Sequence, residues 1–371
     1  MAGPIVITGG GTGGHIFAMQ AVAEQLLAHD VAPERVRYVA SRRGLERTLL
    51  ADSTVAVTLL PGRGLRRAWT ASAVLANIGA VAGLLAACAV ALWRVGAWRP
   101  SAVVSVGGYA SFAVSLAAVV WRRPLVLVEL DATPGAAHRL LGRFAARRCT
   151  AFPTDEARAV VTGAPLRQAI VKLDRSASAR ASLRTRQHPP MEPARLVVVV
   201  MTGSLGARRV NLAVSALAAL WSEREDVTLV HITGRRDYDD VVAARPATRG
   251  LDYRIEAFGD MTTWWTLSDV ALCRAGATTL GELCALGIPS ILVPLPGAPG
   301  DHQSANARAV VAAGGARLVR DEDCRADTLA AMLDEISPAP TLAAMSAAAL
   351  TLGRRDAAAA IAREVSDVAA P

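Results

Sequence analysis

Short apolar runs rich in Val, Ile and Leu recur along the chain, with segments of helical periodicity between them. The runs lie at 4–8, 36–38, 103–106, 125–128, 196–201, 227–232, 270–272 and 290–293. Strands that alternate with helices predict parallel sheets of the doubly wound α/β kind. The run at 196–200 is apolar at every position, which is typical of a strand covered by helices on both faces.

The same pattern divides the chain into two halves. A polar stretch rich in Arg, Ser and Pro covers 174–193, and a new apolar strand follows it. We predict an N-terminal domain over 1–163 and a C-terminal domain over 164–345, since 371 residues suffice for two cores. A last helical segment, 346–371, is a candidate to pack back on the N-terminal domain. Two Rossmann-like domains of this kind are expected to face a crevice, because ligands of open parallel sheets bind outside the carboxyl ends of the strands.

A glycine turn follows the first strand of each half. The first reads GGGTGGH over 9–15, and the second reads TGSLGA over 202–207. Glycines let the backbone approach a ligand, and the free N–H groups at a helix start attract anions. Such a turn alone can merely connect a strand to a helix. His15 adds a titratable side chain at the mouth of the first turn, and the pair of turns predicts two anion sites.

Polar side chains follow other predicted strands. Tyr109 comes after Gly107 and Gly108, and Glu129 and Asp131 end the next strand. Carboxylates at strand ends are favoured functional positions in doubly wound folds. Capping of a helix N-terminus explains Asp131 equally well.

The second half carries two further candidates. Thr279 and Glu282 have the spacing of a capping box. The alternative is that Glu282 accepts hydrogen bonds from a ribose diol. Gln303 and Asn306, three residues apart, would share one helix face and could read sugar hydroxyls.

Metal and disulfide chemistry are not expected. The run DYDD over 237–240 resembles the acidic metal motif of some sugar transferases, but we interpret it as helix N-terminal charge that complements the dipole. No His, Cys and Asp cluster has metal-ligand spacing. The five cysteines are widely spaced, so we expect buried thiols in a reducing compartment. Met1 leads almost at once into a strand without a secretory pattern, which predicts cytosolic synthesis.

The charge balance favours anionic partners. The formal net charge is +8, and Lys172 is the only lysine, so arginine carries the positive charge. A basic protein is attracted to anionic membranes, nucleic acids or phosphorylated small molecules. The basic residues form no long blocks and have no interleaved aromatics, which argues against a nucleic-acid-binding module. No acidic residue lies at a convincing distance after Gly14 for a dinucleotide-dependent dehydrogenase.

One apolar segment allows three interpretations. Residues 68–93 contain no charged side chain, and arginines flank them at 63, 66, 67, 94 and 99. The length suffices to span a bilayer, but a spanning helix would put the flanking strands on opposite sides of the membrane. The segment could instead form ordinary buried helices. The third interpretation is an apolar surface, rimmed by arginines, that docks on anionic lipid.

Taken together, the motifs resemble those of the MurG family over nearly the whole chain. They are GGGTGGH at 9–15, GGY at 107–109, GSLGA at 203–207, RAGA at 274–277 with Glu282, and Gln303 with Asn306. The resemblance implies the two-domain GT-B fold and a peripheral enzyme on the cytoplasmic face of the cell membrane. It implies inverting transfer of N-acetylglucosamine from UDP-GlcNAc to the muramyl sugar of undecaprenyl-diphosphate-linked lipid I, giving lipid II, without a metal or cofactor.

The resemblance also assigns roles to substrate-binding residues. In the first half, Thr12, Gly13 and Gly14 match the loop at the sugar and acceptor diphosphate, with Tyr109 and Asp131 as further candidates. Arg167 and Ser204 match positions near the donor phosphates, Phe258 matches the position whose backbone reads uracil, and Gln303 matches the glutamine that reads the transferred sugar. Asn306 is a further candidate. The stretch that holds the ribose comprises Ala277, Thr278, Thr279, Leu280, Gly281 and Glu282.

The transfer needs a base for the acceptor hydroxyl, and we predict His15, with Glu129 as the rival. The alternative role of His15 is to orient the loop or to donate a hydrogen bond to the acceptor phosphate. The chain departs from the family at 128–131, where members usually read His-Glu-Gln-Asn and this sequence reads VELD. Asp131 beside a diphosphate adds repulsion unless an arginine or a proton offsets it. Leu205 and Ala18 replace the usual Gln and Pro. A MurG-like transferase that acts on a different lipid-phosphate acceptor is therefore the alternative function.

Overall fold

The computed structural model describes residues 3–11, 13–42, 46–61, 71–156, 158–203 and 206–369, without the side chains of 71–78 and 109. The chain forms two compact units. Unit 1 comprises Met1–Gln168 together with Arg355–Pro371, and unit 2 comprises Ala169–Arg354.

Unit 1 is built on a parallel sheet of seven strands in the order β3-β2-β1-β4-β5-β6-β7. The strands are β1 (Ile5–Thr8), β2 (Val36–Ser41), β3 (Ala56–Leu60), β4 (Ala102–Ser105), β5 (Leu125–Glu129), β6 (Arg147–Thr150) and β7 (Ala159–Val161). Ile5 pairs with Val36 on one side and with Ala102 on the other. The sequence order reverses at β1, so the turns after β1 and β4 leave the same edge of the sheet side by side.

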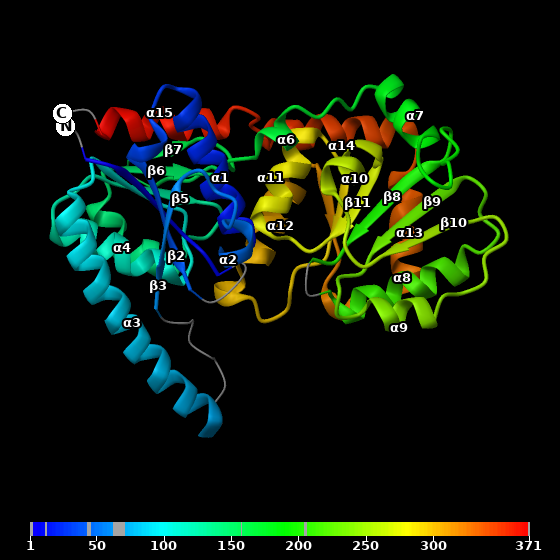
Figure 1. Cartoon of the computed structure of the whole chain (residues 1–371). Coiled ribbons are helices and arrows are strands. Elements are labelled where there is room, and N and C mark those ends of the chain that lie inside the picture. The colour runs from blue at the N-terminus through cyan, green and yellow to red at the C-terminus, as the bar shows by residue number, and fades with distance from the viewer. Residues whose placement is uncertain are drawn as a thin grey trace. The chain divides into compact units, whose positions relative to one another are not determined.

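Helices cover both faces of this sheet (Figure 1). They are α1 (Gly13–Ala28), α2 (Glu46–Leu49), α3 (Ala71–Trp98), α4 (Tyr109–Val120), α5 (Ala136–Leu141) and α15 (Ala357–Ala369), with short 3-10 turns at Pro33–Arg35 and Gly142–Phe144. α1 and α15 pack together on one face, and α3 packs along α4 on the other.

Unit 2 repeats the plan with six parallel strands in the order β10-β9-β8-β11-β12-β13. The strands are β8 (Leu196–Met201), β9 (Val227–Ile232), β10 (Asp252–Glu256), β11 (Val270–Cys273), β12 (Ser290–Leu292) and β13 (Ala316–Leu318). Its longer helices are α7 (Ala177–Thr185), α8 (Arg208–Leu220), α10 (Met261–Leu267), α11 (Ala277–Leu286), α12 (His302–Ala312), α13 (Ala326–Ile336) and α14 (Ala339–Leu352), and its short elements include α6 (Gln168–Val171), α9 (Tyr238–Ala243) and 3-10 turns at Pro299–Asp301 and Asp321–Asp323.

The prediction of two doubly wound α/β domains is confirmed. All eight predicted strands are present, and the five that the pattern missed are β3, β6, β7, β10 and β13. Four of these are the edge strands of the two sheets. The five cysteines are free thiols, and four of them are buried.

The apolar segment forms α3, except that residues 62–70 lie outside the described part of the chain. Gly79–Trp98 is long and apolar enough to cross a membrane, yet only 22% of its apolar window is buried. Ala87, Ala91 and Val95 pack in the core against α4. A core-packed face argues against a helix surrounded by lipid on all sides, and the low burial argues against an ordinary buried helix. The third interpretation, a docking surface, stays a prediction.

Candidate functional site

The first glycine turn connects the carboxyl end of β1 to the N-terminus of α1. Gly10 and Gly11 have φ values of +143° and +92°, which favour glycine. Gly13 and Gly14 are the first residues of α1, and His15 lies in the same helical turn. Thr12 lies outside the described residues. The turn therefore presents a helix N-terminus of the kind that binds anions.

Glu46, which the sequence analysis did not single out, places a carboxylate on this turn. The Gly11 N–H donates to Glu46 Oε1 at 2.6 Å, and the Glu46 side chain is fully buried. A Cβ on Gly10 would lie 2.4 Å from the same oxygen, so only glycine fits. No motif could have revealed this contact, because 35 residues separate the two partners. Part of the anion-binding capacity of the turn is used by the chain itself.

A second turn of unit 1, after β4, packs against the first. Gly107 and Gly108 have φ values of +92° and +84°. A Cβ on Gly108 would lie 2.0 Å from the Gly10 carbonyl oxygen, and one on Gly107 would lie 3.4 Å from His15 Nε2. Tyr109 is the first residue of α4, and its side chain is not described. The structure therefore brings the GGY motif to the first turn and to His15.

Glu129 ends β5 with its carboxylate buried in an ionic network. Its Oε2 lies 2.9 Å from His138 Nδ1, and its Oε1 lies 3.6 Å from Arg148 Nη2. His138 belongs to none of the motifs, so no sequence pattern indicates this role. Asp131 lies partly exposed in the following bend. The N-cap of α5 is Gly135, so the alternative that Asp131 caps the next helix is wrong.

Arg167 is held beside α1. Its guanidinium lies 4.2 Å from the ring centroid of Phe17, two residues after His15. The next residue, Gln168, donates its N–H to Glu24 Oε2 at 3.1 Å, also on α1. The structure thus places Arg167 within unit 1, close to the helix that the first glycine turn opens.

Unit 2 has its own glycine turn, at the carboxyl end of β8. Gly203 and Gly206 have φ values of +84° and +75°, and the Gly206 N–H donates to the Gly203 carbonyl at 3.0 Å. A Cβ on Gly234 would lie 2.4 Å from the Gly206 nitrogen, so another glycine supports the turn. Ser204 and Leu205 lie outside the described residues. α8 begins directly after the turn, as α1 does in unit 1.

The acidic run over 237–240 starts a helix. Asp237 is the N-cap of α9, and Asp239 and Asp240 occupy its first turn. A hydrogen bond from Arg236 lowers the pKa of the Asp237 carboxyl below its ordinary value. Within the described ranges, no three or more His, Cys, Asp or Glu side chains are grouped to hold a metal ion.

The predicted ribose stretch forms the first turns of α11. The N-cap of this helix is Gly276, so the capping-box alternative for Thr279 and Glu282 is wrong. Glu282 is buried, and its Oε2 accepts a hydrogen bond from the Trp265 indole N–H at 2.7 Å. This bond holds the carboxylate in one orientation. The positions concerned are Ala277, Thr278, Thr279, Leu280, Gly281 and Glu282.

The two amides of α12 hold neighbouring loops. Gln303 Oε1 accepts the Leu295 N–H at 2.9 Å, which fixes the loop after β12. Asn306 is fully buried and donates to the Ala275 carbonyl at 3.2 Å, in the turn after β11. Gln303 is partly exposed, whereas Asn306 is fully buried and supports the turn after β11.

Phe258 lies in a braced turn after β10. Its side chain is 62% exposed, with the Arg235 guanidinium 5.4 Å from the ring centroid. The Trp264 indole donates to Glu256 Oε2 at 3.1 Å, and a Cβ on Gly259 would lie 2.4 Å from the indole nitrogen. The backbone around Phe258 is therefore fixed while its ring faces outward.

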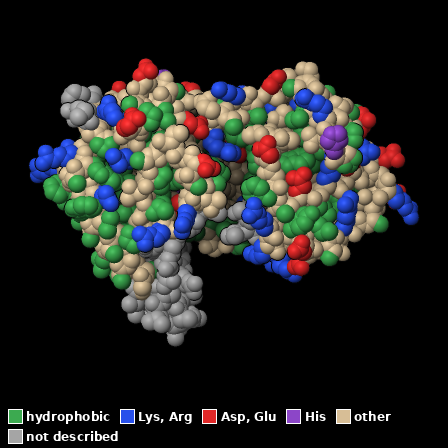
Figure 2. Space-filling view, in the orientation of Figure 1, with side chains coloured by type: hydrophobic (Ala, Val, Ile, Leu, Met, Phe, Trp, Pro, Cys, Tyr) green, Lys and Arg blue, Asp and Glu red, His purple; other side chains and the backbone are tan. Residues whose placement is uncertain are grey.

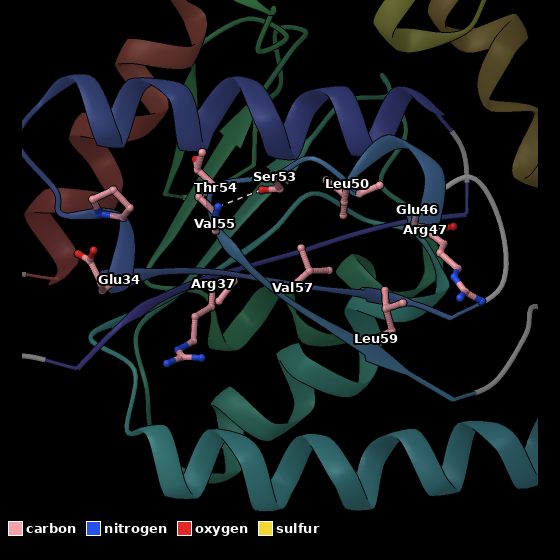
Figure 3. Close-up of a pocket in the computed structure, with 13 residues that line it drawn as sticks. Glu34, Arg37, Glu46, Arg47, Leu50, Ser53, Thr54, Val55, Val57 and Leu59 are labelled. Atoms are coloured by element: carbon pink, nitrogen blue, oxygen red, sulfur yellow. Dashed lines mark hydrogen bonds between the residues drawn. The ribbon is translucent and has the colours of Figure 1, made fainter.

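A hollow of about 640 Å³ lies in unit 1 between the loop before β2, α2 and β3 (Figure 3). It shares Glu46 with the first glycine turn. Glu34, Arg37 and Arg47 line it, together with Glu46. Of the described residues that form its wall, none was predicted as a site residue, and charges of both signs alternate around it. We do not assign the substrates to this hollow.

Two family models match the chain. The glycosyltransferase family 28 N-terminal domain matches residues 5–150, and the glycosyltransferase family 28 C-terminal domain matches residues 197–361. Each model covers one glycine turn and the sheet that carries it.

Curated relatives match along nearly the full length. The UDP-N-acetylglucosamine–N-acetylmuramyl-(pentapeptide) pyrophosphoryl-undecaprenol N-acetylglucosamine transferase of Alkalilimnicola ehrlichii is 39% identical, over 98% of either chain. The enzyme of the same name from Moorella thermoacetica is 35% identical, over 94% of this chain and 95% of the relative. Among solved structures, Acinetobacter baumannii MurG superposes with a TM-score of 0.76 at 25% identity, over 98% of this chain and 99% of that one.

Proposed function

The chain belongs to the MurG family, within glycosyltransferase family 28, and we propose that it transfers N-acetylglucosamine from UDP-GlcNAc to lipid I, forming lipid II. The observation that carries this proposal is the identity of 39% to a transferase of that name over 98% of either chain. The GT-B fold of two parallel α/β units agrees with it.

Unit 2 is the proposed donor unit. The N-terminus of α8, opened by the turn at Gly203 and Gly206, meets the donor diphosphate with backbone N–H groups. Glu282 accepts the ribose hydroxyls, and the backbone at Phe258 reads uracil. Gln303 reads the transferred sugar, and Asn306 supports the neighbouring turn. Ser204 is a further proposed phosphate contact. Arg167, which the family resemblance also assigns to the donor phosphates, belongs to unit 1.

Unit 1 is the proposed acceptor unit, with His15 as the base. The Glu129 carboxylate already accepts a hydrogen bond from His138 Nδ1 and faces Arg148. These contacts make Glu129 a poorer base than His15 for a substrate hydroxyl. His15 stands at the helix N-terminus between the turns that carry Gly13 and Gly107. A neutral imidazole can take a proton at cytosolic pH.

The proposed reaction is a single displacement. The acceptor hydroxyl oxygen forms a bond to the anomeric carbon of the donor sugar while the bond from that carbon to the phosphate oxygen breaks. The hydroxyl proton passes to His15, and UDP leaves with the electron pair. Attack opposite the leaving group inverts the anomeric configuration.

The exposed face of α3 supports a peripheral site on the membrane. Its core-facing positions are small, such as Ala87 and Ala91, whereas Leu85 and Trp93 are 66% and 64% exposed. A helix that packs only on a soluble core buries its large apolar side chains instead. The large apolar groups of α3 are therefore available to lipid.

The end of α4 extends this face, because the Trp121 indole donates to the Leu92 carbonyl of α3 at 2.8 Å. We define the docking surface by Val81, Leu85, Trp93, Val120 and Trp121, all exposed. Arginines border it, and the Arg94 guanidinium lies 4.7 Å from the Trp93 ring centroid. Figure 2 shows hydrophobic side chains gathered over this part of unit 1 with basic ones beside them. An apolar surface with a basic rim fits an anionic leaflet, here the cytoplasmic one.

The test is transfer of radiolabelled sugar from UDP-GlcNAc to a soluble lipid I analogue in the presence of EDTA. We expect full transfer, because helix dipoles and arginine, rather than a metal, meet the diphosphate charge. His15→Ala should lower kcat by about 10²- to 10⁴-fold, as for loss of a general base. His29→Ala, at an exposed histidine of the same unit, is the control.

Each other outcome would change the proposal. UDP-GlcNAc binding without transfer to the lipid I analogue would favour a different lipid-phosphate acceptor, the alternative that Asp131 raises. Near-normal turnover of His15→Ala would remove His15 as the base. Absence of both transfer and UDP-GlcNAc binding would overturn the donor assignment.

A further inference from the structure

His138 links two strand ends of unit 1 through buried hydrogen bonds. Its Nε2 lies 2.8 Å from Ser105 Oγ at the end of β4, and its Nδ1 lies 2.9 Å from Glu129 Oε2 at the end of β5. All three side chains are at least 95% buried. The imidazole comes from α5, so it joins a helix to two neighbouring strands.

The partners fix the proton arrangement. A carboxylate only accepts hydrogen bonds, so His138 Nδ1 carries a proton and donates a hydrogen bond to Glu129. In the neutral imidazole Nε2 is then an acceptor, and the Ser105 hydroxyl donates to it. Arg148 from β6 stands on the other side of Glu129, with Nη2 at 3.6 Å from Oε1, and it also pairs with Glu156. Glu129 is thus held between an imidazole and a guanidinium.

This network borders the position that faces His15. Ser105 precedes Gly107 by two residues, and a Cβ on Gly107 would lie 3.7 Å from His138 Cε1 and 3.4 Å from His15 Nε2. Both imidazoles therefore approach the same backbone position. A shift of the His138 ring or of Ser105 displaces the Gly107 turn, and with it the surroundings of His15.

We infer that His138 is a positioning residue for the acceptor half of the reaction, which fixes the Gly107 turn and the Glu129 carboxylate around His15. This inference rests on the proposed transfer to lipid I. Hydrogen-bonded Ser, His and acid side chains also form the triads of hydrolases. Here the Ser105 side chain is fully buried and cannot reach a substrate, so the network supports a turn and is not itself nucleophilic.

The test compares His138→Phe, His138→Gln and Ser105→Ala in the full-length protein. Phe keeps a ring but makes neither hydrogen bond, whereas Gln can restore one of them. For His138→Phe we expect kcat/KM for the lipid I analogue to fall by about 10- to 100-fold, because small displacements of a reacting group are costly. KM for UDP-GlcNAc should stay within about twofold, since the donor binds to unit 2. His138→Gln should recover part of the loss, and Ser105→Ala should show a smaller loss of the same kind.

His29→Phe, the same change at an exposed histidine of unit 1, is the matched control and should behave as wild type. A folded His138→Phe protein with unchanged kcat/KM for the lipid I analogue would overturn the inference. So would a change in KM for UDP-GlcNAc as large as the change in KM for the lipid I analogue. If His138→Phe does not fold, Ser105→Ala and His138→Gln decide by the same comparison. Wild-type protein that fails to glycosylate lipid I would instead overturn the proposed function.

Discussion

At the scale of single residues, buried polar networks stand behind both glycine turns. In unit 2 the fully buried His231 has Nδ1 2.9 Å from the Tyr253 hydroxyl and Nε2 2.9 Å from Asn211 Oδ1. Asn211 Nδ2 then donates to Asp237 Oδ2 at 2.9 Å, and a Cβ on Gly206 would lie 2.8 Å from that oxygen. The chain of contacts runs from the sheet to the turn proposed to bind the donor diphosphate.

Because of His231, the free energy of unfolding depends on pH. Burial lowers the pKa of its imidazole from 6.5 to about 3 in the folded protein. Between these values the unfolded chain binds a proton that the folded chain does not. The stabilisation is therefore complete above about pH 6.5, and the free energy of unfolding falls by up to about 1.4 kcal/mol per pH unit as the pH drops toward 3.

We predict that His231→Gln flattens this slope. Urea unfolding at a series of pH values from 7 to 4 measures it, and slopes rather than absolute stabilities are compared, since the substitution also alters packing. His29→Gln, at an exposed histidine, should keep the wild-type slope. Equal slopes for His231→Gln and wild type would show that this imidazole is not the responsible group.

Whether a site residue could be predicted depends on whether its contacts lie close together in the sequence. The glycine turns, His15 and the α11 stretch could be predicted because a strand, a turn and a helix start are consecutive in the chain. Glu46 and His138 could not, because each meets its partner across the sheet edge and neither belongs to a spaced motif. The capping alternatives for Asp131 and Thr279 failed for a local reason, since glycine holds both N-cap positions.

At the scale of elements, four of the five strands that escaped prediction lie at the edges of the two sheets. Central strands such as β8 are covered on both faces and read as continuous apolar runs. Edge strands are less covered, so β10 mixes charged and apolar residues and β7 and β13 have three residues each. β6 begins with Arg147 and Arg148, which pair with Glu364 and Glu129. The charged residues of such strands can be explained only once the structure shows the residues that they contact.

α3 is the element whose exposed face has a testable consequence. Leu85→Glu or Trp93→Glu puts a charge on the docking surface and should weaken binding to anionic vesicles by about 10-fold or more, given about 1.5–3 kcal/mol for burying such a side chain. Transfer to a soluble acceptor analogue should not change, because both side chains are exposed on the surface of α3. Vesicle sedimentation measures the binding.

Leu220→Glu is the matched control. Leu220 is 59% exposed, on α8 of unit 2, so the same substitution alters an apolar surface of similar exposure outside the docking surface. It should leave vesicle binding unchanged. If Leu220→Glu weakens binding as much as Leu85→Glu does, general charge repulsion rather than the α3 face accounts for the effect.

At the scale of the whole molecule, the chain returns to the unit in which it began. Unit 2 ends at Arg354, and α15 then packs on α1 and beside β4, β5 and β6 of unit 1. Ile361 and Val365 are fully buried in α15, and Glu364 pairs with Arg147 at 3.0 Å. Unit 1 is therefore completed by α15, which follows unit 2 in the sequence, whereas unit 2 is continuous in sequence.

This discontinuity predicts that a lesion in α15 acts on the far end of the sequence. Ile361→Asp buries an unpaired charge, which costs several kcal/mol and should loosen α15. Hydrogen exchange should accelerate in peptides from α1 and β4–β6, although more than 200 residues separate them from the substitution. Hydrogen exchange in β8–β13 of unit 2 should stay as in wild type. UDP-GlcNAc should also slow exchange in these strands to the same extent as in wild type. Ser366→Asp, which puts the same residue on the exposed side of α15, should change neither. Faster exchange across both units would mean that they unfold cooperatively, and α15 would then stabilise the whole chain rather than unit 1 alone.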